Sequence, residues 1–357
     1  MKNSDSETKT QGWGQKLPSL VGILYSEVKR EYFPTEAQYV TEKDALAEAK
    51  IVAGYLERLG VRVKLYQGTP EVTAKLLRDK PEMVFNLVGS IRGQEYLASV
   101  IPGILEALDV PYTGAGILGE SLDYNKFLVK ELLQSHAVPV PRFQLFSSAQ
   151  TVLDPRLRFP LMAKLNEIHG AVEISKGAVS YDERHLRERA RFLIATYQQP
   201  VLVEEFIAGR EFTAILLEGL NKKVYVGEKV FATDDPYEFA TFEAQWEKTG
   251  ETFTYRKYGD QPLVEQVKRA FDVLRMSDYG KFDIRFDQSG RYYFVDSNSN
   301  PAFGPKETDC ALSNILDLYG IKFSEILKRL LLNTMRDAMG KEKLPIPDAG
   351  EGGVSPT

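Results

Sequence analysis

The 357-residue sequence has a single cysteine, Cys310, so it cannot form an internal disulfide bond. It also lacks the paired Cys and His spacings of a structural zinc site. We therefore expect a protein of a reducing, cytoplasmic environment. No apolar run is long enough for a signal peptide or a membrane helix, so the sequence gives no reason to expect a membrane partner.

An excess of positive charge is missing too, because 45 Lys and Arg stand against 50 Asp and Glu. Nucleic-acid-binding surfaces usually need a basic excess, so we do not expect nucleic acid as a partner. The sequence shows no internal repeat, P-loop or GxGxxG motif. What it does have is 43% hydrophobic residues, enough for a substantial core and two or three domains.

Short apolar runs at residues 21–24, 61–65 and 83–86 predict the strands of a parallel βαβαβ unit. Between the first two, apolar residues from Ala45 to Leu56 recur at helical spacing before Gly60. This pattern predicts an α/β first domain.

A mixture of helices and strands is predicted for the rest of the chain. We expect a helix from an N-cap at Ser121 through Gln134, a strand at 159–164, a helix at 183–194, and a mainly antiparallel sheet from 201–206, 211–217 and 224–229, covered by helices around 263–276 and 323–332. We divide the chain into a mobile leader (1–18), an N-terminal α/β domain (19–119), a central α+β part (120–199), a C-terminal α+β part (200–336) and a disordered tail (337–357).

Residues 280–298 predict a β-hairpin with a turn at Gln288 and Ser289. Its first strand alternates apolar and charged side chains, which sends them to opposite faces: Phe282, Ile284 and Phe286 against Lys281, Asp283 and Arg285.

The hairpin also contains candidate metal ligands. Asp296 and Asn298 are two residues apart and share a face, and the turn brings Asp283 diagonally close. Mg²⁺ favours a few carboxylate or amide oxygens and completes its shell with phosphate and water. The alternative is a solvated acidic hairpin end.

Two further patterns suit a nucleotide. Lys126 and Lys164 interrupt apolar segments, which makes them candidate phosphate-binding cations. The alternative for Lys164 is an exposed strand end. Glu204, Glu205 and Glu211 flank a Gly turn, where carboxylates can accept hydrogen bonds from ribose and a strand edge can contact adenine. An exposed acidic linker explains the same acids.

Together these residues resemble the D-alanine:D-alanine ligase branch of the ATP-grasp superfamily, from about Val21 to Leu332. Segments 85–89, 101–106 and 110–116 look like the first domain of that branch, with Pro-Tyr-Thr-Gly at 111–114 moderately specific. The resemblance implies an ATP-grasp fold: a Rossmann-like N-terminal domain on the substrate side and two α+β subdomains that clasp ATP, the C-terminal one carrying the metal site.

The resemblance also implies roles for individual residues. Lys126, Lys164 and the backbone at Gly170 would contact ATP phosphates; Glu204, Glu205 and Ile207 would hold adenine and Glu211 the ribose; Asp283, Asp296 and Asn298 would hold Mg²⁺, with two ions implied and Mn²⁺ as a substitute. Lys281 stands where the family commonly has arginine, and Asp296 where it has glutamate. Arg285 would stabilise an acyl phosphate, or else pair with Asp287 or Glu205.

Three segments differ from the family pattern. Loop 164–173 lacks both serines of the phosphate-covering motif, and its His169 is either a polar substitute or an ordinary loop residue. Loop 233–258 is expected to be a lid carrying Gln245 and Trp246, with Gln245 at a position usually lysine and Lys248 as a compensating cation, or else ordinary packing. The turn after Pro301 is longer than in the family, and its Lys306 either binds a substrate carboxylate or is solvated.

The implied reaction joins a small-molecule carboxylate, activated as an acyl phosphate, to an amine and releases ADP and phosphate. We expect an amino-acid or dipeptide ligase of specialised metabolism, and a homodimer as is common in the family. The alternatives are a D-alanine:D-alanine ligase proper, a kinase that releases its acyl phosphate, and a non-ligating ATP-binding regulatory protein.

Overall fold

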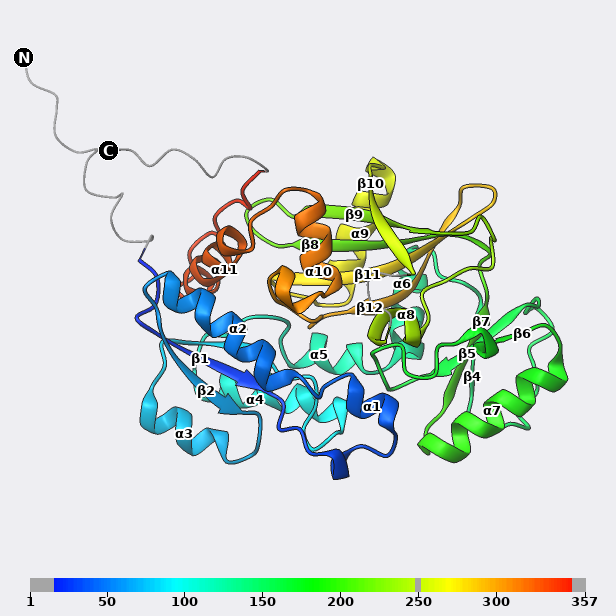
Figure 1. The fold of residues 1–357 in the computed structure, drawn as a ribbon, viewed down its shortest axis with the longest axis horizontal. Helices are drawn as coiled ribbons and strands as arrows, with labels where there is room; N and C mark the ends of the chain where they lie inside the picture. Colours follow the sequence, from blue (N-terminus) through cyan, green and yellow to red (C-terminus); the bar gives the residue numbers. More distant parts are fainter. Residues whose placement is uncertain (1–15, 248–251, 349–357) are drawn as a thin grey trace, which may run out of the picture.

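The structure is a computed structural model that describes residues 16–247 and 252–348. Within this part of the chain the strands form three sheets, of three, four and five strands, with helices packed around them (Figure 1). The mixed α/β architecture expected from the sequence is confirmed.

The N-terminal part is a small parallel sheet with helices on it. Its strands are β1 (Leu20–Tyr25), β2 (Arg62–Gln67) and β3 (Met83–Leu87). Both β2 and β3 pair with β1 in parallel, as the apolar runs predict. Its helices are α1 (Glu36–Val40), α2 (Ala45–Arg58), α3 (Val72–Asp79), α4 (Val100–Ala107) and α5 (Ile117–Asp123), with short 3₁₀ turns at Arg30–Tyr32 and Glu95–Ser99. Helix α2 buries Val52 and Leu56 and ends just before Gly60, whose φ of +81° suits glycine.

The helix predicted from Ser121 through Gln134 is wrong, because the chain forms two helices there. Ser121 lies inside α5, and a second helix, α6 (Lys126–Ser135), follows. Asn125 separates them: its side-chain oxygen accepts a hydrogen bond from the Leu128 amide at 3.0 Å. This cap starts a new helix at Lys126.

The central sheet has the strand order β4-β7-β5-β6. Its elements are β4 (Phe143–Phe146), β5 (Leu161–Leu165), β6 (Val179–Ser180), β7 (Val201–Glu205), a 3₁₀ turn at Lys176–Ala178 and helix α7 (Glu183–Tyr197). Helix α7 packs Leu186 and Leu193 on this sheet.

The third sheet is antiparallel, in the order β10-β9-β8-β11-β12. Its elements are β8 (Gly209–Leu217), β9 (Lys223–Phe231), β10 (Phe253–Tyr258), β11 (Tyr279–Asp287) and β12 (Tyr292–Asn298), with helices α8 (Phe242–Trp246), α9 (Gln261–Val273), α10 (Ala311–Leu318) and α11 (Phe323–Ala338) and a 3₁₀ turn at Lys306–Thr308. The expectation that residues 201–206 join this sheet is wrong. Strand β7 pairs with β4 and β5 instead, and residues 206–208 carry the chain from one sheet to the next.

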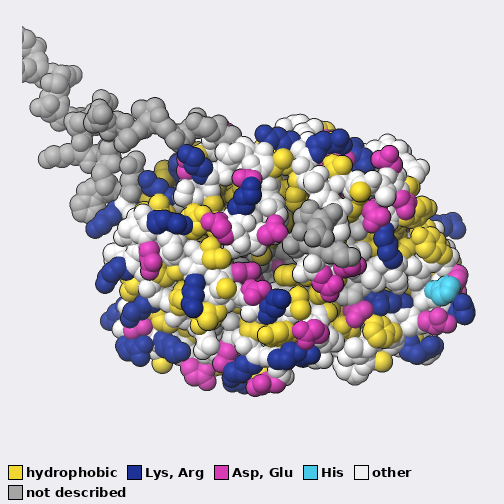
Figure 2. Space-filling view, in the orientation of Figure 1, with side chains coloured by type: hydrophobic (Ala, Val, Ile, Leu, Met, Phe, Trp, Pro, Cys, Tyr) yellow, Lys and Arg dark blue, Asp and Glu magenta, His cyan; other side chains and the backbone are white. Residues whose placement is uncertain are grey.

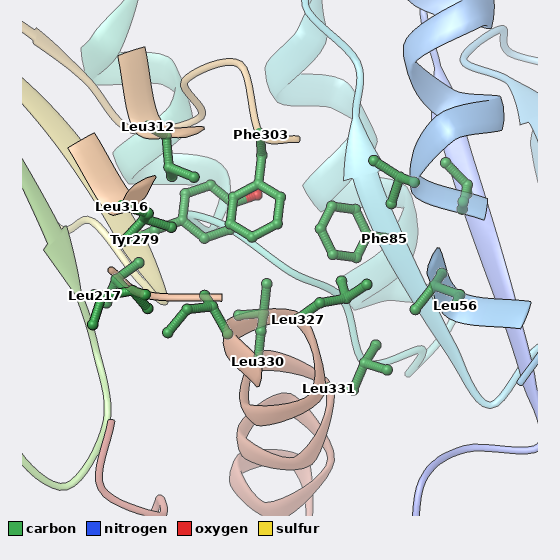
Figure 3. Close-up of a cluster of buried hydrophobic side chains, with 14 of the residues drawn as sticks. Leu56, Phe85, Leu217, Tyr279, Phe303, Leu312, Leu316, Leu327, Leu330 and Leu331 are labelled. Carbon is green, nitrogen blue, oxygen red and sulfur yellow. The ribbon is translucent and has the colours of Figure 1, made fainter. Parts of the chain in front are cut away.

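One core joins the N-terminal part to the C-terminal part. Figure 3 shows Phe303, from the loop after β12, between Phe85 of β3 and Tyr279 of β11. Its ring centroid is 5.3 Å from that of Phe85 and 4.8 Å from that of Tyr279. Leu327 and Leu331 of α11 complete the cluster. Residues 299–305 are therefore anchored where the two parts meet.

The described residues after α11 pack on the protein, contrary to the disordered tail expected from residue 337. The Leu344 amide donates to Asn333 Oδ1 at 2.7 Å, and Ile346 is buried in the core. The rest of the expected tail and most of the expected leader lie outside the described residues. No described helix is long and apolar enough to cross a membrane.

Candidate active site

A cavity of about 710 Å³ lies where the N-terminal part, the central sheet and the five-stranded sheet meet. Its walls come from α2 and β3, from the loop after β5, and from β11, β12 and the loop that follows them. Figure 2 shows Asp and Glu side chains close to the hollow near the middle of this face. Segments far apart in the sequence thus face one space.

A β-bulge in the β11–β12 hairpin puts two aspartates on the same face. Near the turn Ile284 pairs with Phe294, but farther along Asp283 pairs with Asp296, so Val295 is an extra residue on β12. Such a bulge reverses the face taken by the side chains beyond it. Asp296 therefore lies directly opposite Asp283 in the cavity wall, not diagonal to it as predicted, and does not share the buried face of Phe294.

Lysine side chains surround these two carboxylates. Lys281 Nζ donates to Asp283 Oδ2 at 2.5 Å and to Asn298 Oδ1 at 3.0 Å. Lys126 Nζ is 3.6 Å from Asp296 Oδ1. Burial raises the pKa of Asp296, but the ammonium groups of Lys126 and Lys164 outweigh it and hold this pKa well below its usual range. The carboxylate is therefore ionised at neutral pH.

The oxygen donors of the hairpin suit Mg²⁺ shared with a nucleotide. Among the described residues no three His, Cys, Asp or Glu side chains are grouped to hold a metal ion alone. Asp283, Asp296 and Asn298 supply two carboxylates and one amide oxygen on adjacent strands. Mg²⁺ typically takes one or two protein carboxylates and completes its shell with phosphate oxygens and water.

Lys164 belongs to a buried charged triad. Glu204 Oε1 is 2.5 Å from Lys164 Nζ, and Glu204 Oε2 is 2.7 Å from Lys130 Nζ. Both lysines also donate to the bulge: the Val295 carbonyl accepts from Lys164 at 2.7 Å and from Lys130 at 3.4 Å. Burial lowers the pKa of Lys130 to about 8, although Glu204 opposes this. The triad ties the central sheet to the hairpin.

Lys130 was missed by the sequence reasoning. It lies one helical turn after Lys126, beside Val129 and Leu133 on the buried face of α6. A lysine within an apolar helix face is the signal that could have revealed it.

An apolar wall lies next to the triad. Met162, Phe206 and Phe239 are buried against one another and line the cavity. Such a wall suits the flat face of a purine. Glu205 also lines the cavity, but its Oε1 is engaged by the Arg158 amide, from which it accepts a hydrogen bond at 2.9 Å.

Arg285 and Glu211 form a second buried charged group. Arg285 Nη1 donates to Glu211 Oε2 at 2.8 Å, and Lys229 Nζ donates to Glu211 Oε1 at 2.7 Å. The other guanidinium nitrogens donate to backbone carbonyls: Nε to Ile207 at 2.6 Å and Nη2 to Gly209 at 2.9 Å. Protein acceptors thus engage every guanidinium nitrogen of Arg285. Its contacts join β11 to the β7–β8 connection. They involve Glu211, whereas pairing with Asp287 or Glu205 was expected.

The segment expected to be a lid contacts loop 164–173. Trp246 Nε1 donates to the Gly170 carbonyl at 2.7 Å, and Gln245 lines the cavity next to it. Gly170 has a φ of +67°, and a Cβ there would meet Thr41 at 2.6 Å. Lys248 lies outside the described residues.

Carboxylates line the N-terminal side of the cavity. They include Glu42, Asp44 and Glu48, none of which the sequence reasoning identified. Ser90 Oγ donates to Glu42 Oε2 at 2.8 Å. Because they follow no recognisable motif, only their arrangement in space reveals them.

Comparison with known proteins decides the family. The family described as D-ala D-ala ligase C-terminus matches residues 132–332, more than half of the chain. The chain belongs to the D-alanine:D-alanine ligase family. A D-alanine–D-alanine ligase of Alkalilimnicola ehrlichii is 32% identical over 253 residues, which cover 68% of this chain and 76% of that protein. A D-alanine–D-alanine ligase of Pseudomonas entomophila is 26% identical over 298 residues, which cover 80% of this chain and 89% of that protein. The crystal structure of the Bacillus anthracis D-alanine–D-alanine ligase complexed with ATP shares the fold, with a TM-score of 0.68 at 16% identity, covering 90% of this chain and 99% of that one.

This ligase is thus an ATP-grasp enzyme that forms ADP while joining a carboxylate to an amine. The residues predicted for its site that line the cavity are Lys126, Lys164, Gly170, Glu204, Glu205, Ile207, Glu211, Gln245, Trp246, Lys281, Asp283, Arg285, Asp296 and Asn298. Lys306 is not among them: its exposed side chain pairs with Asp317 at 2.6 Å.

The contacts of Arg285 predict that this side chain stabilises the folded protein. We expect Arg285→Met to lower the free energy of unfolding by about 2–4 kcal/mol, because it leaves buried carbonyls without a donor and Glu211 with one cation fewer. Arg291→Met is the control on the same hairpin, since that side chain is 74% exposed, and we expect a change below about 0.5 kcal/mol. Urea unfolding of both variants makes the comparison, and equal midpoints would contradict the structural role.

Proposed function

We propose that this ligase joins two amino acids through an acyl phosphate, with a pair of D-alanine molecules as the first substrates to test. The relatives named D-alanine–D-alanine ligase favour this alternative at least as well as the specialised-metabolism ligase expected from the sequence. A non-ligating regulatory protein is disfavoured by the lysines and carboxylates that face the cavity.

The observation that carries the proposal is the convergence of three lysines and three oxygen donors on one wall of the cavity. Lys126, Lys164 and Lys281 lie around the face that carries Asp283 and Asp296. Phosphoryl transfer develops negative charge on phosphate oxygens, and ammonium groups held beforehand in such a wall stabilise it. Mg²⁺ held by Asp283, Asp296 and Asn298 would add positive charge at the same oxygens.

In the proposed reaction, an oxygen of the substrate carboxylate attacks the γ-phosphorus of ATP, and the bond to ADP breaks. The deprotonated amine of the second substrate then attacks the acyl carbon, and phosphate leaves. The amine gives up a proton, so the products are an amide, ADP and phosphate. We assign positioning of the phosphates to Lys126 and Lys164, and of the acyl oxygens to Lys281.

The N-terminal side of the cavity supports amino-acid substrates. Glu42, Asp44 and Glu48 present carboxylates to a space that also reaches the lysines. Carboxylates bind ammonium groups through charge-assisted hydrogen bonds. An amino acid placed there can have its ammonium group on this side and its carboxylate toward Lys281.

A ligase for another pair of amino acids is the second candidate. Loop 164–173 lacks both serines typical of the family, and the turn after Pro301 is longer and brings Asp309 and Cys310 to the cavity. Both changes line the cavity, and they leave Lys126, Lys164, Lys281 and the two aspartates in place.

The test is ADP release with Mg²⁺ and ATP across a matrix of paired amino acids, with product masses read by mass spectrometry. We expect release that depends on both substrates and a new mass equal to their sum minus water. A product from D-alanine alone supports the first candidate, and a product only from another pair supports the second. ADP release that needs no amine would indicate a kinase, and no stimulated release from any pair would overturn the ligase proposal.

A further inference from the structure

His169 is a partly buried histidine on the phosphate-covering loop that contacts a candidate metal ligand. Its ring nitrogen Nδ1 is 2.7 Å from Asn298 Nδ2 on β12. Its other ring nitrogen, Nε2, is 2.9 Å from the Asp123 carbonyl oxygen. The loop after β5 and the end of the hairpin are therefore connected through one imidazole.

The chemistry of the partners determines the orientation of both side chains. The Asp123 carbonyl can only accept, so His169 must carry its proton on Nε2, which makes Nδ1 an acceptor. Asn298 must then present its NH₂ group to His169. On the other side, Lys281 Nζ can only donate, so the Asn298 atom facing it at 3.0 Å must be the oxygen. Two independent partners thus require the same orientation of the Asn298 amide.

The imidazole is itself held in place. The His169 backbone amide donates to Glu95 Oε2 at 2.8 Å, which ties the loop to the N-terminal part. The ring packs edge-to-face on Tyr124, with centroids 5.3 Å apart. A ring fixed at both nitrogens, one face and the backbone can fix its partner.

We propose that His169 is a positioning residue that holds the amide oxygen of Asn298 toward the metal-binding face. The inference rests on the proposed function, in which Asn298 is a metal ligand. Without His169, only Lys281 keeps the Asn298 amide in this orientation. A flipped amide would present its NH₂ group to the metal, and this orientation repels a cation. Residues that orient a metal ligand typically contribute 10–100-fold to metal affinity or activity.

Three substitutions separate positioning from packing. His169→Leu fills the space but accepts no hydrogen bond. His169→Asn places an amide oxygen near the position of Nδ1 and restores the acceptor. His169→Gln reaches the position of Nε2 and leaves Nδ1 without a substitute. His185→Leu is the matched control, because this histidine is exposed on α7, away from the cavity.

The readout is the affinity of each variant for Mn²⁺ in the presence of ADP. Binding is measured as the decrease in the EPR signal of free Mn²⁺. We expect His169→Leu and His169→Gln to weaken Mn²⁺ binding by about 10–100-fold. His169→Asn should recover most of the affinity, and His185→Leu should match the wild type. Equal weakening in the Leu, Gln and Asn variants would show a packing role and overturn the proposal.

The wild type and Asp296→Ala separate this inference from the proposed function. If the wild type binds no Mn²⁺ with ADP, or if Asp296→Ala binds it as well as the wild type does, the metal assignment fails and the inference fails with it. If Asp296→Ala loses Mn²⁺ while His169→Leu keeps wild-type affinity, only the role of His169 is wrong. If His169→Leu does not fold, the comparison of the Asn and Gln variants decides alone.

Discussion

Asp296→Ala is expected to lower the rate of ADP release by about 100-fold or more. The substitution removes one of two carboxylates that face the cavity from adjacent strands. In the proposed function this carboxylate is a ligand of Mg²⁺, whose positive charge stabilises phosphoryl transfer. We expect the free energy of unfolding to change by less than about 2 kcal/mol, because the side chain is 29% exposed and fills no core position. Steady-state assays and urea unfolding on the same preparation measure both effects.

Glu265→Ala is the control for Asp296→Ala. It removes a carboxylate from α9 in the same part of the chain, but that side chain is 57% exposed, and its partners Lys268 and Gln261 lie on the same helix at the surface. We expect its activity and stability to match the wild type. Turnover by Asp296→Ala within a few-fold of the wild type would remove Asp296 from the proposed metal site.

The position of Asp296 also shows where sequence reasoning stops. Alternation along 281–286 correctly predicts that Phe282 and Ile284 are buried while Asp283 faces the other side. The two-residue turn expected at Gln288 and Ser289 brought Asp283 only diagonally close to Asp296. With the observed pairing of Ile284 with Phe294, strict alternation would put Asp296 on the buried face of Phe294. Only the extra residue at Val295 reverses this, and a bulge depends on pairing between strands that a local pattern does not contain.

Buried charges were the least predictable part of the site. Glu204 and Arg285 could be identified as candidates because acids and a guanidinium interrupt apolar strands. Their partners could not: Lys130 is 74 positions before Glu204, and Glu211 is 74 positions before Arg285. The strands, in contrast, follow from periodicities within a few residues, so most of them were predicted near their observed places.

These partners change how the charged residues of the cavity are understood. A lysine on an apolar strand was expected to meet phosphate, and Lys164 does line the cavity, but it also neutralises Glu204. Its ammonium group is thus held in position by the protein before any phosphate arrives. Electrostatic stabilisation needs such fixed charges, because they do not have to reorganise during the reaction.

The Lys130–Glu204–Lys164 triad should therefore be essential to stability as well as to ATP binding. We expect Glu204→Ala to lower the free energy of unfolding by about 3–5 kcal/mol, because it leaves two ammonium groups buried without their shared counter-charge. Glu205→Ala is the matched control one residue along the strand, where the carboxylate accepts only a surface hydrogen bond, and it should cost less than about 1 kcal/mol. Urea unfolding at neutral pH measures both, and equal losses would show that the triad is not a buried charge pair.

The stability of Glu204→Ala should also depend on pH, and the direction of this dependence can be predicted. Burial already lowers the pKa of Lys130 to about 8 with Glu204 present, and losing the carboxylate must lower it further. Between that pKa and the higher pKa of an unfolded lysine, the unfolded chain binds more protons than the folded protein. Stability should therefore rise with pH in this window. We expect Glu204→Ala to regain part of its lost stability between about pH 7 and pH 9, and to regain more than Glu205→Ala does. A loss that stays constant over this range would mean that the missing side chain, and not the unpaired lysines, destabilises the variant.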